Sequence, residues 1–199
     1  QISDSFFPTG LYTMSNGLET LFSEKRITGM DELCELIQTN IVQQIGPSDC
    51  VALSNAYDST SLNDVEKIIM CDRSLFAMKL VKELREAVCR SGTQMIKCIS
   101  SFVSNDTLFS YHNAIKNSQT PGTHAVVTGV TSNVLRIEKQ KAILHFLYGF
   151  SVSMVGAALR LGIIEHLQSQ KILHLLKPVI AETCDKYISK SLNDMWQFA

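Results

Sequence analysis

The sequence predicts an all-α fold, a single-domain bundle of about eight to ten helices around a long buried helix in the C-terminal half. Three observations favour this fold. Apolar residues recur at helical spacing almost everywhere after residue 17. Only 4 prolines and 10 glycines interrupt the 199 residues, which favours long elements. Hydrophobic residues make up 45% of the chain and charged residues 19%, which excludes an intrinsically disordered protein.

The first elements are predicted from turn and capping signals. Residues 1–16 are expected to form a loop within a single domain that spans residues 1–199. Residues 31–45 have the apolar spacing of a helix, with Asp31 as a candidate N-cap. The tripeptide Gly46-Pro47-Ser48 is expected to end that helix, and its serine or the following aspartate to cap the next one. A further helix is expected to open at residues 65–71.

One long amphipathic helix is expected over residues 72–102, because apolar positions recur there three, four and seven residues apart. Its apolar face would consist of Leu80, Val81, Leu84, Val88, Met95 and Ile99. Gly92 falls in its middle, where glycine costs about 1 kcal/mol relative to alanine. It therefore marks either a break or a place where another helix comes close. A shorter helix over residues 105–115 and a loop at Thr120-Pro121-Gly122 follow.

The last third of the chain leaves one choice between strand and helix. Residues 124–130 contain β-branched residues and are compatible with a short buried strand. A lone strand has no ladder to join, so we expect a helix. Residues 138–168 are expected to form the longest and most buried helix. The pair Lys177-Pro178 is expected to kink or restart the final one.

The apolar segment 142–164 has a second interpretation as a membrane helix. Its first eighteen residues carry no formal charge, and a transmembrane helix needs roughly 20 apolar residues. Several serines and glycines interrupt it, which favours a fully buried central helix. Gly149, Ser153 and Ala157 lie at i, i+4 and i+8, so they are expected to form a seam against a neighbouring backbone.

The formal net charge of −1 conceals an asymmetry. Residues 1–72 carry eleven acidic and three basic side chains, a net charge of −8. Residues 73–199 carry eight acidic and fifteen basic side chains, a net charge of +7. The two parts either neutralise each other within one body or present oppositely charged surfaces to different protein partners. The overall charge gives no reason to expect nucleic-acid binding.

Searches for catalytic and metal-binding patterns fail. The six cysteines include no CxxC pair, which predicts a reduced, cytoplasmic chain. The five histidines are scattered, and His166 and His174 lie about 80° apart around a helix, so no chelating pair is predicted. Phosphate-loop, dinucleotide, HExxH and GxSxG patterns are absent from the sequence. A binding module without a cofactor or metal site is therefore favoured over an enzyme.

The N-terminal segment carries the most specific pattern in the chain. Residues 4–19 read DSFFPTGLYTMSNGLE, which joins a Pro/Gly turn to an aromatic residue and then to a capped helix start. By spacing alone, an ordinary loop leading into a helix is the other interpretation. The segment resembles the opening signature of the UreF family of urease accessory proteins, approximately SDSxxPxGxFxxSxGLE. The matching residues are Pro8, Gly10, Tyr12, Ser15, Gly17 and Glu19.

Three later stretches resemble the same family in the expected order, so the resemblance covers essentially the whole chain. Their matching residues are Arg85, Gly92, His124, Gly129, Arg160 and Gln170. There are departures: Glu165-His166 stands where the family commonly has Gly-Gln, and Leu11 stands where a small residue is usual. The family's polar tail is expected to be absent after Phe198-Ala199.

The resemblance implies a non-enzymatic, homodimeric assembly factor. Such proteins bridge the nickel-carrying urease accessory GTPase and the accessory protein called D or H. They support nickel delivery into apo-urease and modulate GTP hydrolysis, with no nucleic-acid or membrane partner. The resemblance assigns partner binding to Tyr12, Glu19, Arg85 and Arg160.

Each assignment has an alternative. The Tyr12 ring is either an interface anchor or a buried ring that closes the N-terminal loop. Glu19 either meets a partner or only complements the helix N-terminus. Arg85 and Arg160 either meet a partner or form internal ion pairs. Two other functions also stay open, a helical enzyme whose cofactor pocket is assembled from distant residues and a membrane-attached adaptor that uses residues 142–164.

Overall fold

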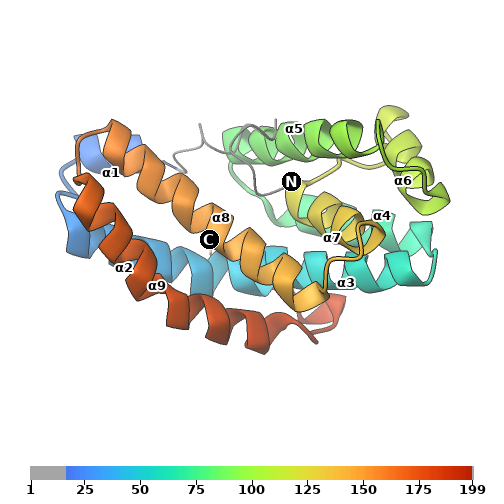
Figure 1. Cartoon of the computed structure of the whole chain (residues 1–199). Coiled ribbons are helices and arrows are strands. Elements are labelled where there is room, and N and C mark those ends of the chain that lie inside the picture. Colours follow the sequence, from blue (N-terminus) through green and yellow to red (C-terminus); the bar gives the residue numbers. More distant parts are fainter. Residues whose placement is uncertain (1–16, 199) are drawn as a thin grey trace.

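The computed structural model describes residues 17–198, and within them the chain forms helices and no strand (Figure 1). The elements are α1 (Leu18–Ser23), α2 (Met30–Asn40), η2 (Ile41–Cys50), α3 (Val51–Ser61), α4 (Val65–Met78), α5 (Lys82–Ile99), α6 (Asp106–Lys116), α7 (His124–Val134), α8 (Lys139–Arg160), α9 (His166–Tyr187) and η3 (Leu192–Asp194). The all-α prediction is confirmed, and residues 124–130 are helical as expected.

The elements α2, η2 and α3 follow one another without a break and form a helical rod along the length of the molecule (Figure 1). The predicted stop at residues 46–48 is wrong. The segment η2 is a π-helix with Pro47 inside it, and a wider π-turn accommodates a proline that an α-helix tolerates poorly. The N-cap of α2 is Gly29, and Asp31 lies in the first turn instead, where a carboxylate complements the helix dipole.

The single helix expected over residues 72–102 is also wrong. Helix α4 ends at Met78 and α5 begins at Lys82, with extended backbone at Lys79 and Val81 between them. In this link, Leu80 is 66% exposed and Val81 is 53% exposed. Apolar spacing alone therefore misplaced these two residues, because the break turns them away from the core.

Helix α7 is the most buried element, since residues 124–132 are all buried. Two glycines allow its neighbours to come this close. A Cβ on Gly129 would lie 2.3 Å from Leu53 O in α3. A Cβ on Gly92 of α5 would lie 2.1 Å from Gly122 O, just before α7. Gly92 therefore marks a close approach and not a helix break, and α7 packs between α3 and α5.

Helices α8 and α9 replace the single helix expected over residues 138–168. Helix α8 ends at Arg160, and Gly162 with φ of 70° begins the turn into α9. Pro178 lies inside α9 without restarting it. By length and composition α8 alone among the described helices qualifies as a membrane span, yet half of its most apolar window is buried inside the structure. It is therefore neither fully buried, as predicted, nor evidence of a membrane protein.

Among residues 17–198, no backbone packs closely against Gly149, the first residue of the small-residue seam predicted on α8. A Cβ added at Gly149 would meet no described atom within 4 Å, and one added at Gly156 would meet only the Arg160 side chain. Ser153 and Ala157 are buried. Gly149 and Ser153 instead line the groove described below.

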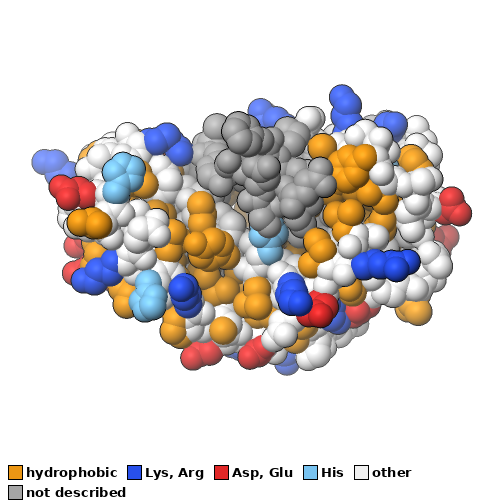
Figure 2. Space-filling model, viewed as in Figure 1, with side chains coloured by type: hydrophobic (Ala, Val, Ile, Leu, Met, Phe, Trp, Pro, Cys, Tyr) orange, Lys and Arg blue, Asp and Glu red, His pale blue; other side chains and the backbone are white. Residues whose placement is uncertain are grey.

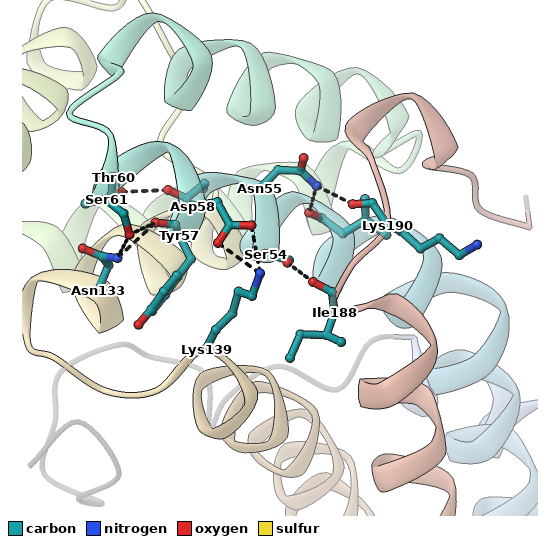
Figure 3. A network of polar contacts seen from close by, with 12 residues as sticks. Ser54, Asn55, Tyr57, Asp58, Thr60, Ser61, Asn133, Lys139, Ile188 and Lys190 are labelled. Atoms are coloured by element: carbon teal, nitrogen blue, oxygen red, sulfur yellow. Dashed lines mark hydrogen bonds and ion pairs between the residues drawn. The ribbon is translucent and has the colours of Figure 1, made fainter.

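Polar contacts connect α3 to the ends of three other helices (Figure 3). Asn133 Nδ2 donates to Ser61 Oγ at 2.6 Å and to Tyr57 O at 3.1 Å, which ties α3 to the end of α7. Lys139 Nζ pairs with Asp58 Oδ2 at 2.8 Å and ties α3 to the start of α8. Asn55 Nδ2 donates to Lys190 O at 2.9 Å, and Ser54 Oγ donates to Ile188 O, both after α9. These bonds orient α8 and α9 on the rod.

Candidate functional site

The start of α7 is fixed by a buried carboxylate, Asp72 of α4. Its oxygens accept hydrogen bonds from Thr120 Oγ1 and Gly122 N, both at 2.6 Å. They also accept from Thr123 N at 2.7 Å and from Thr123 Oγ1 at 2.5 Å. Asp72 is fully buried, and these four donors satisfy it. A carboxylate at a helix N-terminus is also favoured by the helix dipole. The clamp sets the position of His124, the first residue of α7.

An apolar groove opens beside His124, with a cavity of about 420 Å³. Its walls come from α1, α2, η2, the 79–81 link, α5, α7, α8 and residues 197–198. The apolar lining includes Leu36, Ile45, Leu84, Val88, Met95, Phe146 and Phe150. Figure 2 shows hydrophobic side chains gathered along the middle of this face, with Lys and Arg side chains beside them. A mostly apolar cleft of this size with a few polar groups is typical of a binding site.

Two histidines lie in the wall of the groove. The His124 ring stacks on Phe146 with centroids 5.6 Å apart, and its Nδ1 lies 3.3 Å from Ser91 Oγ. Burial, with a smaller contribution from His145, lowers the pKa of His124 to about 4. Burial also lowers the pKa of His145. Both imidazoles are therefore neutral at pH 7.

A buried ion pair lies at the end of the groove nearest the 79–81 link. Lys79 Nζ is 2.5 Å from Asp49 Oδ2, and the two side chains are 11% and 6% exposed. Ser48 Oγ lies 2.8 Å from the same carboxylate oxygen. The pair joins η2 to the link between α4 and α5. It therefore holds the exposed Leu80 and Val81 at the rim of the groove.

The cysteines offer little nucleophilic chemistry. All six are free thiols, and burial raises the pKa of Cys71 to about 12 and of Cys89 and Cys184 to about 11. Such thiols stay protonated at neutral pH and react poorly. Among residues 17–198, no group of three or more His, Cys, Asp or Glu side chains is placed to hold a metal ion. What the described groove offers is apolar surface with a polar rim, the composition of an interface core.

The residues singled out in the sequence lie in four kinds of place. Pro8, Gly10, Tyr12 and Ser15 lie outside the described residues. Gly17 is the N-cap of α1 with φ of 83°, a left-handed conformation that suits glycine. Gly92, His124 and Gly129 surround or lie within α7, and His124 borders the groove. Glu19, Arg160 and Gln170 are exposed, the last two far along the chain on α8 and α9.

Arg85 makes internal contacts, although not the ion pair considered as its alternative. Its guanidinium lies over the Phe76 ring, 5.2 Å from the centroid, and its Nη1 donates to Lys79 O at 3.4 Å. The side chain is half-buried on α5. Arg85 thus braces the break between α4 and α5.

Sequence reasoning missed the Asp72 clamp, the Asp49–Lys79 pair and the placement of both His124 and His145 in the groove wall. The partners of Asp72 lie 48 to 51 residues away along the chain, so no local pattern reveals them. The only local signal was the run Thr120-Pro121-Gly122-Thr123, which places several donors together.

Comparisons with known proteins agree over nearly the whole chain. The family model of UreF matches residues 27–177. A urease accessory protein UreF from Trichodesmium erythraeum (strain IMS101) is 34% identical over 196 residues, which cover 98% of this chain and 84% of that protein. Urease accessory protein UreF 1 from Brucella melitensis is 29% identical over 199 residues, with coverages of 100% and 82%. A UreF from Actinobacillus pleuropneumoniae is 24% identical over 190 residues, with coverages of 96% and 84%.

Proposed function

Because the chain belongs to the UreF family of urease accessory proteins, we propose that it assists urease maturation by bridging two other accessory proteins. One is the GTPase that carries nickel, and the other is the protein called D or H. The observation that carries the proposal is 34% identity to a urease accessory protein over 98% of the chain. Nickel is the cargo of this assembly, passed into apo-urease in the cytoplasm, and the chain modulates when GTP is hydrolysed.

The charge distribution supports contacts with different proteins. Exposed acidic side chains outnumber exposed basic ones along α1, α2 and their connection: Glu19, Glu24, Asp31, Glu32 and Glu35 against Lys25 and Arg26. Exposed basic side chains outnumber exposed acidic ones more modestly along α5 and α9: Lys82, Arg90, Lys97, Lys171, Lys177 and Lys186 against Glu83, Glu86, Glu182 and Asp185. Surfaces of opposite sign select different partners and speed their association. The second copy of the chain in a homodimer doubles both surfaces.

We assign partner binding to Tyr12, Glu19, Arg85 and Arg160. Glu19 lies in the first turn of α1 with its side chain exposed. Arg160 is exposed in the last turn of α8. Arg85 stays in this group as a proposal, with its guanidinium also placed over Phe76 and bonded to the Lys79 carbonyl.

A pull-down tests the proposal. The tagged chain is mixed with the urease accessory GTPase and the D- or H-type protein of the same organism, and the eluted complex is weighed by light scattering. We expect both partners to be retained, on two copies of the chain. Retention of neither partner, with the protein folded, would refute the bridging function.

The same assay tests the assigned residues. Glu19→Ala and Tyr12→Ala are expected to weaken capture of the GTPase with the melting temperature unchanged. Glu66→Ala is the matched control, since Glu66 is an exposed glutamate in the first turn of another helix, α4, outside this acidic surface. A lower melting temperature with full capture per folded molecule would instead assign Glu19 and Tyr12 to the fold.

A further inference from the structure

Two backbone carbonyls of the π-helix η2 accept hydrogen bonds from a segment far along the chain. The carbonyl of Gln43 accepts a hydrogen bond from Phe198 N at 3.0 Å. The carbonyl of Pro47 accepts one from Trp196 N at 3.3 Å. The donors come from the segment that follows η3, residues 195–198, which we call the strap.

The strap also reaches the end of a second helix. Gln197 Nε2 donates to the carbonyl of Met78, the last residue of α4. The final carbonyls of a helix have no intrahelical donor, so this bond acts as a C-cap. Gln44 Nε2 donates in turn to Phe198 O at 3.4 Å. The strap therefore joins η2 to α4 at the level of the Asp49–Lys79 pair.

The strap forms part of the groove wall. Gln197 and Phe198 line the cavity together with Gln44, Asp49 and Lys79. Its attachment is nevertheless shallow, because Trp196 is 42% exposed and Phe198 is 68% exposed. Within the strap Met195 packs against the core, whereas residues 196–198 are held by four hydrogen bonds and little apolar burial. A segment held in this way opens at low free-energy cost. Such a segment can detach while the helices beneath it stay folded.

We propose that the strap is a gate on the apolar groove, closed by its hydrogen bonds to backbone carbonyls of η2 and of the end of α4. When the strap is seated, it covers the end of the groove at η2 and the 79–81 link. When it is released, the apolar walls at that end become accessible to an apolar ligand. This inference goes beyond the proposed function and does not depend on it, because it concerns access to the groove within one chain.

The fluorescence of one tryptophan reports whether the strap is seated or released. Trp196 is the single tryptophan of the sequence and lies in the strap. The test variant is Phe198→Pro, which removes the N–H that bonds Gln43 O. Phe198→Ala is the matched control, because it keeps that N–H and removes only a largely exposed ring. A second test variant, Gln197→Ala, removes the bond to Met78 O by a different route.

Two measurements are made on the full chain, with circular dichroism confirming that each variant is folded. We expect Trp196 fluorescence in Phe198→Pro and Gln197→Ala to shift to the red with lower anisotropy. We expect binding of the apolar dye ANS to rise at least about threefold in the same variants. Phe198→Ala should resemble the parent in both measurements. If Trp196 emission or ANS binding in the two test variants equals that of the parent, or if Phe198→Ala changes as much as they do, the gate is refuted.

Discussion

Asp72 shows how one buried charge organises distant parts of the chain. Four donors from three residues converge on its two carboxylate oxygens, and all of them belong to the loop that begins α7. A charge with no exposed surface is stable only when such donors satisfy it. The same contacts place His124 at the groove, so the fold and the candidate site share this residue.

Replacing Asp72 with alanine is therefore expected to be strongly destabilising. Each buried donor left unpaired costs about 1–3 kcal/mol, so we expect Asp72→Ala to lower the free energy of unfolding by at least about 3 kcal/mol. Asp58→Ala is the control, because its ion pair with Lys139 is largely exposed on the aspartate side and should cost less than about 1 kcal/mol. Urea denaturation measures both. Equal losses in the two variants would contradict the clamp.

The buried His124 predicts a specific pH dependence. Its pKa is about 4 in the folded state, below the ordinary value of 6.5 that applies when the chain is unfolded. The unfolded state therefore binds the proton first as the pH falls. Stability due to neutral His124 is complete above pH 6.5 and is lost progressively toward pH 4, by about 3 kcal/mol.

Unfolding free energies between pH 7 and pH 4 test this dependence. His124→Gln should lose distinctly less stability over that range than the parent does, although it starts from a lower value at pH 7. His174→Gln, which changes an exposed histidine of α9, should follow the parent. Parallel curves for the parent and His124→Gln would show that the imidazole does not stay neutral through burial.

At the scale of the elements, helical spacing predicted the helices but not where several of them end. The helix expected over residues 105–115, the loop expected at Thr120-Pro121-Gly122 and the helix expected in place of a lone strand at residues 124–130 are confirmed as α6, the loop after it and α7. The sequence pattern missed the break at residues 79–81, because a tertiary ion pair holds that link. It also placed a stop at Pro47, where the chain continues as a π-helix whose Gln43 and Pro47 carbonyls bond residues about 150 positions later. Partners so far apart leave no trace in a local pattern.

The candidate site was less predictable than the fold. The resemblance singled out His124, Gly92 and Gly129, and the structure explains the glycines as close approaches around α7. The resemblance did not indicate a groove, since the walls of the groove come from residues between 21 and 198. Spacing along the chain cannot report a cavity assembled from several separate segments.

The glycine contacts give a prediction at this scale. Gly92→Ala would place a Cβ 2.1 Å from a backbone oxygen, and backbone cannot move aside without shifting α7. We expect overpacking to cost about 1–3 kcal/mol. Gly149→Ala, also inside a helix, meets no described atom within 4 Å and should be neutral or stabilising by up to about 1 kcal/mol. Thermal melts of both variants test this prediction. An unchanged melting temperature in Gly92→Ala would contradict it.

At the scale of the whole molecule, the helical rod of α2, η2 and α3 runs along the molecule beside the other helices (Figure 1). The groove is lined by residues of this rod together with residues of α5, α7 and α8. The acidic side chains of α1 and α2 and the basic side chains of α5 and α9 occupy different elements. An accessory protein that joins several partners needs such separate surfaces, because each partner must bind without displacing another.

The most direct test of the central claim is activation of urease in a defined mixture. Apo-urease is incubated with nickel, bicarbonate, GTP, the accessory GTPase and the D- or H-type protein, with and without this chain, and ammonia release is measured. We predict that urease activity rises at least about tenfold when the chain is present and that omission of GTP abolishes the increase. Equal activity with and without the chain, when all partners are folded and active, would contradict its function as a urease accessory protein.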